Sequence, residues 1–135
     1  MANFVFGDCV NITCSHLGQT YRFSPKANES FNVDKGGIRG NDDMNQVTSN
    51  GQMMSQLNNA RWAVDGLIAV DQNSDLELSS LNLMAGSPSL GRWQFDMISG
   101  AIYVGTGRPV GDIATDSNAG TLPLKVSGGG ILQKI

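Results

Sequence analysis

The last third of the chain, residues 93–135, decides its fold and reads WQFDMISGAIYVGTGRPVGDIATDSNAGTLPLKVSGGGILQKI. Apolar and polar residues alternate over three of its segments, which are residues 93–98, 102–104 and 121–127. A period of two is typical of β-strands. Ser99-Gly100 suits a two-residue hairpin turn, and residues 116–120 form a second cluster of turn-forming residues. The stretch therefore predicts strands joined by tight turns.

Glycines share one face in the middle of this stretch. Gly105, Gly107 and Gly111 have the same parity as Pro109. A strand face without side chains lets another backbone approach closely, or it marks a bulge. Because proline has no N–H to donate, Pro109 belongs at a sheet edge or at a bulge.

Upstream, residues 60–71 (ARWAVDGLIAVD) predict a long strand whose two faces are both partly apolar. One face carries Trp62, Val64, Gly66, Ile68 and Val70, and the other carries Arg61, Ala63, Asp65, Leu67, Ala69 and Asp71. Apolar residues on both faces indicate a strand that is packed from both sides.

One short helix is expected over about 75–85. Ser74 and Glu77 have the spacing of a capping box, and Asp75 adds negative charge at the positive end of the helix dipole. Gly86 suits the left-handed position after the last turn. We expect this helix to cover an open edge or face of the β structure.

The first half of the chain predicts short strands followed by a long early loop. Alternation over residues 8–15, 21–23 and 30–34 indicates strands, but the pattern is lost over about 35–51. A connection of this length is either a mobile surface loop or an arm that binds a partner. Asp42 and Asp43 are adjacent carboxylates without further acidic ligands, which favours solvated side chains over a cation site.

Composition favours one domain, residues 1–135, with a modest core. Charged residues make up only 16%, which suits a subunit that hides much of its surface against neighbours. The net charge of −3 suits a surface that repels phosphate, and the nine Lys and Arg residues form no cluster that would bind nucleic acid. We expect no signal peptide and no membrane span.

The candidate chemical groups do not form a catalytic or cofactor site. Cys9, Cys14 and His16 provide three ligands where structural zinc normally has four, so no metal or cofactor is expected. On a regular strand the two cysteines would lie on opposite faces, which predicts free thiols, with a disulfide between subunits as the alternative. His16 is expected at the surface, and nothing in the spacing of Asp65 and Asp96 requires a carboxylate pair. We therefore expect no enzymatic activity.

Taken together, the sequence predicts a mainly β fold. The expected architecture is a two-sheet β-sandwich or barrel with one short α-helix at about 75–85 and a long early loop at about 35–51.

The order of the long strand, the capped helix and the glycine-rich ending resembles the tail tube proteins of long-tailed bacteriophages, especially contractile ones. The resemblance extends over residues 46–135. It is carried by Gly100, Tyr103, Gly105, Gly107, Gly111, Asp112, Asp116, Gly120, Thr121, Leu124, Gly128 and Gly130.

The resemblance implies a structural protein of the virion tail, assembled in the host cytoplasm. Six copies would form a ring, and stacked rings would form a hollow tube that conducts DNA during ejection. Partners would be other copies of the chain and the tail sheath, baseplate and tail terminator proteins, with no membrane. The tape measure protein and DNA would pass through the lumen without specific binding. Related tubes occur in phage-like bacteriocins and in type VI secretion.

The resemblance also assigns roles to particular residues. The early loop would reach a neighbouring subunit through Gly36, Gly37, Ile38, Arg39, Asp42, Asp43 and Met44. The lumen would be acidic, with some of Asp65, Asp71, Asp96 and Asp112 facing it. The alternative is a monomeric β-sandwich that binds a ligand through the loop at 35–51.

Overall fold

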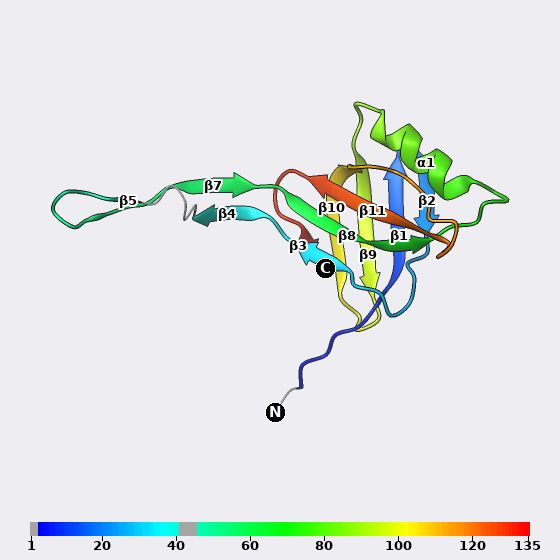
Figure 1. Cartoon of the computed structure of the whole chain (residues 1–135), viewed down its shortest axis with the longest axis horizontal. Helices are drawn as coiled ribbons and strands as arrows, with labels where there is room; N and C mark the ends of the chain where they lie inside the picture. The colour runs from blue at the N-terminus through cyan, green and yellow to red at the C-terminus, as the bar shows by residue number, and fades with distance from the viewer. Residues whose placement is uncertain (1–2, 41–45) are drawn as a thin grey trace.

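A computed structural model describes residues 3–40 and 46–135 and consists mainly of β-strands with one short helix, α1 (Figure 1). The helix is α1 (Leu76–Ala85). The strands of the body are β1 (Cys9–His16), β2 (Gln19–Phe23), β3 (Asn32–Asp34), β8 (Trp62–Ala69), β9 (Gly91–Met97), β10 (Ile102–Pro109), β11 (Thr121–Gly128) and β12 (Gln133–Lys134). Shorter strands project from the body, namely β4 (Gly37–Gly40), β5 (Gln46–Val47), β6 (Met53–Met54) and β7 (Leu57–Ala60). In the described part of the chain, no helix is long and apolar enough to span a membrane.

The strands of the body follow one antiparallel path that folds over itself. The order is β2-β1-β9-β10-β11-β8-β3, and β12 pairs with the first half of β10. Strand β10 changes layers, because residues 102–107 pair with β9 whereas Arg108 and Pro109 pair with β11. The expected β-rich fold with one helix is thus confirmed, and it is consistent with a sandwich. The sheet is not closed into a barrel, since β2 and β3 stand at opposite ends of the path.

The core lies between the two layers and is built around aromatic rings. Trp93 and Phe95 of β9 stack with ring centres 6.3 Å apart, and Phe23 stacks with Trp93 at 6.0 Å. Trp62 of β8 meets Phe95 edge-on at 6.4 Å. All four rings are almost entirely buried. These residues are the apolar positions of the alternating strands, so the period of two places them on the inner face.

Glycines make room for the Trp62 indole where β10 bends between layers. A Cβ built on Gly105 would lie 2.9 Å from the Trp62 ring, and one on Gly128 would lie 2.8 Å from its Nε1. A Cβ on Gly107 would lie 2.2 Å from the carbonyl oxygen of Ser127. The expectation of close approach at a glycine-lined strand face is therefore confirmed, and the approaching group is a tryptophan and its neighbouring strand.

Helix α1 packs on the body, but its ends differ from the expected ones. Leu81 and Met84 are buried, and the Met84 sulfur lies 3.5 Å from Cys14 Sγ on β1. The capping box is absent: Asp75 is the N-cap, in a left-handed conformation, and makes no side-chain capping bond. The Ser74 hydroxyl instead donates to the carbonyl oxygen of Asp71 at 3.3 Å, a bond within the preceding turn that satisfies none of the first-turn N–H groups of the helix.

The end of α1 also corrects the expectation for Gly86. This glycine has a φ of −87°, within the right-handed region. Its N–H donates to the carbonyl of Asn82 at 3.2 Å, and Ser87 N–H donates to that of Met84 at 3.2 Å. These carbonyl groups of the last turn therefore accept hydrogen bonds without a residue in the left-handed conformation.

The prediction of an irregular early loop at 35–51 is wrong for its described residues. Strands β4 and β5 fall within that range and pair with β7 and β6. These two strands belong to the outgoing half of a β-hairpin whose return half runs to Ala60. The periodicity was lost because neither face of this hairpin is buried, and a strand exposed on both faces shows no alternation.

The glycine packing around Trp62 leads to a stability prediction. Gly107→Ala would push a methyl group into the Ser127 backbone, and we expect it to lower the free energy of unfolding by about 3 kcal/mol. Gly129→Ala is the matched control, because nothing lies within 4 Å of its Cβ position. Chemical denaturation monitored by tryptophan fluorescence would compare them. Equal midpoints for the two variants would contradict the proposed packing.

Candidate assembly surface

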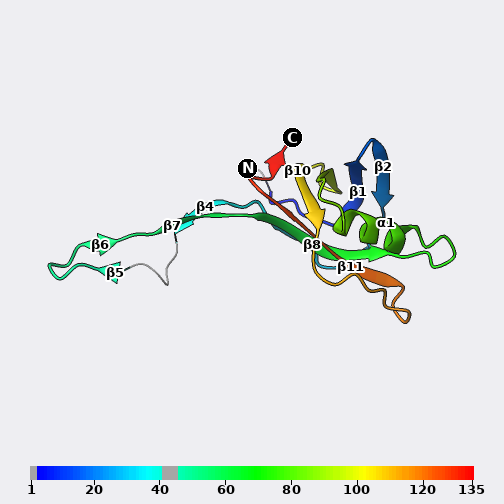
Figure 2. The ribbon, with the colours of Figure 1, turned by 90° about the horizontal axis from the view of Figure 1, so that it is seen from above.

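A long two-stranded hairpin, of which the structure describes residues 37–40 and 46–60, projects from one side of the body and is called the arm below (Figures 1 and 2). Strands β4 and β7 form its inner part, and β5 and β6 form its outer part. The inner part continues the register of the body, since Asp34 pairs with Ala63 and Gly37 pairs with Ala60. The arm is therefore an extension of the β3–β8 pair rather than a separate unit.

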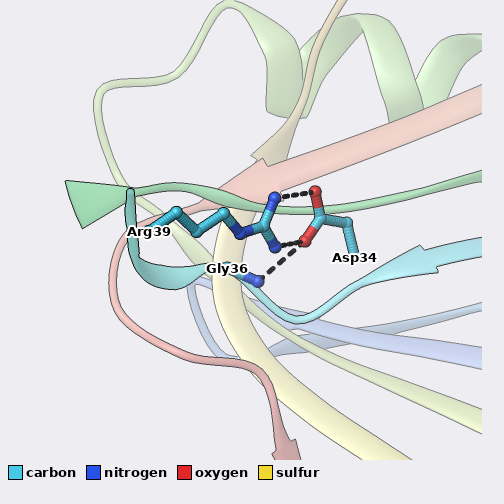
Figure 3. Close-up of polar contacts among 3 residues, drawn as sticks. All are labelled: Asp34, Gly36 and Arg39. Carbon is cyan, nitrogen blue, oxygen red and sulfur yellow. Dashed lines mark hydrogen bonds and ion pairs between the residues drawn. The ribbon is translucent and has the colours of Figure 1, made fainter. Parts of the chain in front are cut away.

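The root of the arm, residues 34–37, combines a glycine turn with an ion pair (Figure 3). Both carboxylate oxygens of Asp34 accept hydrogen bonds from the Arg39 guanidinium, one of them at 3.0 Å. Asp34 Oδ1 also accepts the Gly36 N–H at 3.0 Å. Gly36 has a φ of +74°, and a Cβ there would lie 2.7 Å from the Trp62 nitrogen. Only glycine fits this position, and the bidentate ion pair links the end of β3 to β4.

The tip of the arm is a defined turn. Thr48 N–H donates to the carbonyl of Gln52 at 2.7 Å, and Gly51 N–H donates to the carbonyl of Thr48 at 2.9 Å. The Thr48 hydroxyl oxygen accepts the Gln52 N–H at 2.9 Å. These bonds close the hairpin that joins β5 to β6.

Beyond Gly40, the described part of the arm carries no charged residue and exposes several large apolar side chains among polar uncharged ones. In the described part of the arm, the large hydrophobic side chains each expose half or more of their surface, and they are Ile38, Val47, Met53, Met54 and Leu57. Residues 46–60 contain no Asp, Glu, Lys or Arg. Exposed strand edges are normally protected by charge, proline or a covering element. This hairpin has apolar side chains and no charge on residues 46–60, so its surface is suited to contact with another chain.

The sequence assigned Gly36, Gly37, Ile38 and Arg39 to this surface. Gly36 and Gly37 form the root, with Gly37 buried, and the Ile38 side chain is exposed. Arg39 is held by Asp34, a residue that sequence reasoning did not single out. The sequence signal that could have identified this ion pair is the placement of opposite charges, Asp34 and Arg39, on either side of the two glycines. Asp42, Asp43 and Met44 lie outside the described residues.

The four candidate lumen acids fall on different surfaces. Asp65 lies on the outer face of β8, and Asp96 lies on the outer face of β9, where Asn11 and Gln94 donate to its carboxylate at 3.4 and 3.0 Å. Asp71 is in the turn before α1 and accepts the Asn73 N–H at 3.0 Å. Asp65 and Asp96 therefore stand on separate layers and do not form a carboxylate pair.

A groove on the outer face of β8 and β11 contains the fourth acid, Asp112. It has a volume of about 380 Å³, with Leu67, Val110 and Pro123 among its apolar lining residues. Asp65, Asp112 and Lys125 supply charges of both signs. The groove is open to solvent and lies on the side of β8 opposite to the buried Trp62, Val64 and Ile68.

Strand β1 corrects two predictions. A register shift between Cys9 and Asn11 reverses the parity, so Cys9 and Cys14 are both buried instead of lying on opposite faces. His16 is also buried, and its Nε2 lies 3.2 Å from the carbonyl oxygen of Ser89. Both thiols are free. No group of three or more His, Cys, Asp or Glu suited to a metal ion occurs in residues 3–40 and 46–135.

The root ion pair leads to a pH prediction. Hydrogen bonds from Arg39 and then from the Gly36 N–H lower the pKa of Asp34 from 3.8 to about 2. A lowered pKa in the folded state means that the pair contributes fully above about pH 4 and is lost as the pH falls toward 2. An NMR titration of the Asp34 carboxyl carbon would measure this. Arg39→Gln should raise the titration midpoint of Asp34 toward 3.8, whereas Arg61→Gln should change that midpoint less. A larger effect of Arg61→Gln than of Arg39→Gln would refute the ion pair between Asp34 and Arg39.

The buried thiols lead to a reactivity prediction. Burial raises the pKa of Cys9 to about 11 and that of Cys14 to about 12. At pH 8 the thiolate fraction of either residue is then about one in a thousand or less, so alkylation by iodoacetamide should be very slow until the chain unfolds. Mass spectrometry with and without denaturant would follow the labelling. Rapid modification of folded protein at both positions would contradict this.

Comparison with known proteins does not identify the chain: no protein-family model matches it, and no curated protein matches it.

Proposed function

We propose that this chain is a non-enzymatic, self-assembling structural subunit of a phage-like tail tube. Six copies form a ring, and rings stack into a hollow inner tube through which DNA passes during ejection. In the virion the tube ends contact the baseplate and the tail terminator, the sheath surrounds it, and the tape measure protein occupies the lumen. The glycine-rich ending that resembles tail tube proteins supports this identity.

The observation that carries the proposal is the arm. Five large hydrophobic side chains of the described part of the arm are exposed on a hairpin that extends into solvent. Residues 46–60 include no charged side chain that would favour exposure of this surface to water. Burial of one such side chain contributes roughly 1.5–3 kcal/mol, so a partner that covers several of them gains enough to offset the cost of association. A second copy of the chain is always present at equal concentration and supplies unpaired strand edges at β2 and β3.

The distribution of acids supports a phosphate-repelling channel in either orientation of the subunit. Asp96 lies on the outer face of one layer, whereas Asp65 and Asp112 border the groove on the other. Whichever outer face is turned toward the lumen therefore carries at least one of the four acids. Negative charge on that face would keep DNA from adhering to the wall.

Negative-stain electron microscopy of the purified full chain tests the proposal directly. We expect rings in end view and tubes in side view. A protein that stays monomeric at high concentration under all salt conditions would refute it. If that monomer binds another protein only when the arm is present, the alternative of a binding module replaces it.

A shortened variant tests the role of the arm. Gly37 and Ala60 are paired, so replacing residues 38–59 by Asn-Gly closes the hairpin with a two-residue turn. We expect a folded monomer, because the deleted residues that the structure describes do not contribute to the core, and we expect no rings or tubes. Circular dichroism would check the fold and sedimentation velocity would measure assembly.

A second variant separates the apolar surface from the length of the arm. Val47→Ser, Met53→Ser, Met54→Ser and Leu57→Ser are combined in one chain, and Asn58→Ser with Asn59→Ser is the polar control on the same strand. The first variant should lose assembly and the control should keep it. If both variants assemble at the same protein concentration as the wild type, the apolar side chains of the arm do not contribute to the interface.

A further inference from the structure

The turn at the end of the arm holds a pair of residues with a reactivity of its own, Asn50 and Gly51. This turn joins β5 to β6 at the end of the arm farthest from the body (Figures 1 and 2). Asn50 is the one asparagine of the chain that is followed by glycine. Both residues are exposed, and nothing lies within 4 Å of the position that a Cβ on Gly51 would take. The pair is therefore accessible to water.

In an asparagine followed by glycine, the side-chain amide and the next peptide nitrogen react with each other readily. The Gly51 nitrogen loses its proton to a base, attacks Asn50 Cγ and closes a succinimide ring. The bond from Cγ to the amide nitrogen breaks, and that group takes a proton from water and leaves as ammonia. Water then opens the ring at either carbonyl, which gives aspartate or isoaspartate at position 50. Glycine favours ring closure because it has no Cβ to obstruct the nitrogen and its backbone is the least restricted.

Thr48 holds the Asn50 amide in a state that favours this attack. Its hydroxyl donates a hydrogen bond to Asn50 Oδ1, the oxygen that becomes negatively charged as the Gly51 nitrogen adds to Cγ. A donor placed on that oxygen stabilises the charge that develops there. The same hydroxyl oxygen accepts the Gln52 N–H at 2.9 Å, so the backbone of the turn keeps the hydroxyl in place.

One hydrogen bond opposes the reaction and must open first. The Gly51 N–H donates to the carbonyl of Thr48 at 2.9 Å, and the nitrogen can attack only when this bond is broken. The strands on either side of the turn, β5 and β6, are two residues long each and contribute nothing to the core. Local opening of such an exposed segment costs much less free energy than global unfolding. The turn therefore opens in the folded chain, whereas a partner that covers it would keep the bond closed.

We infer that Asn50 is a site of spontaneous deamidation in the unassembled chain and that the products weaken assembly. Residues 46–60 contain no Asp, Glu, Lys or Arg, so the new carboxylate places a charge on an uncharged surface, where its burial against a partner is unfavourable. Isoaspartate also adds one atom to the main chain between Thr48 and Gln52, whose mutual hydrogen bonds close the turn. The effect on assembly rests on the self-assembly proposed above, whereas the reaction itself does not.

Peptide-mapping mass spectrometry of the full chain tests the reaction. Folded protein is kept at a concentration at which it does not assemble, beside a sample in guanidinium chloride. Asn50 should gain about one dalton and yield isoaspartate in the folded sample, no more than about a hundredfold more slowly than in the denatured one. Asn118 is the internal control, because it is also exposed in a turn but is followed by Ala119. Asn50 that stays intact in folded protein while it reacts in denatured protein would overturn the inference, as would equal rates at Asn50 and Asn118 in the folded sample.

A second measurement separates the new charge from the loss of the amide. Asn50→Asp should raise the protein concentration needed for assembly by about tenfold or more, whereas Asn50→Ser, which stays neutral, should leave that concentration unchanged. Assembly of Asn50→Asp at the wild-type concentration would refute the effect on assembly. If the wild-type chain deamidates at Asn50 but forms no rings, the tube is refuted and the modification site stands.

Discussion

The packing of Trp62 against glycine-bearing strands is the interaction on which the rest of the structure depends. Its ring occupies the space that side chains at Gly105 and Gly128 would fill, at the place where β10 leaves one layer for the other. The same residue begins β8, and its backbone nitrogen lies against Gly36 at the root of the arm. One buried tryptophan therefore fixes both the fold of the sheet over the core and the point from which the arm leaves the body.

The body of the fold was largely predictable because its strands have one buried face. Trp93 and Phe95 alternate with polar neighbours, and burial follows that alternation. Predictions failed where a local feature of the backbone interrupted the regular pattern of apolar and polar residues. A register shift between Cys9 and Asn11 brings Cys9 to the buried face of Ile12 and Cys14, and β1 continues regularly to His16, which is buried on that same face. At α1, the Ser74 hydroxyl bonds the Asp71 carbonyl and does not cap the helix.

The hairpin that forms the arm was predictable in its place in the chain but not in its form. Residues 35–51 were correctly separated from the body, yet their strands were missed because a hairpin in solvent has no inner face to impose a pattern. The return strand at Leu57–Ala60 reads LNNA, which has neither the β-branched residues nor the alternation of a buried strand. Such a segment keeps its strand pairing through backbone bonds and tip geometry, and its side chains remain available to a partner.

The geometry of the root bears on the symmetry of the proposed assembly. An arm that leaves one side of a subunit and lands on a different surface of the next makes a head-to-tail contact, and the rotation between copies decides whether the series closes into a ring. In the proposed assembly that rotation would depend on where the arm joins the body. Gly36 provides the turn there, and the bidentate bond between Asp34 and Arg39 links β3 to β4. Under this proposal the residues that contact the neighbour would govern how strongly copies associate, and the root would govern how many copies complete a turn.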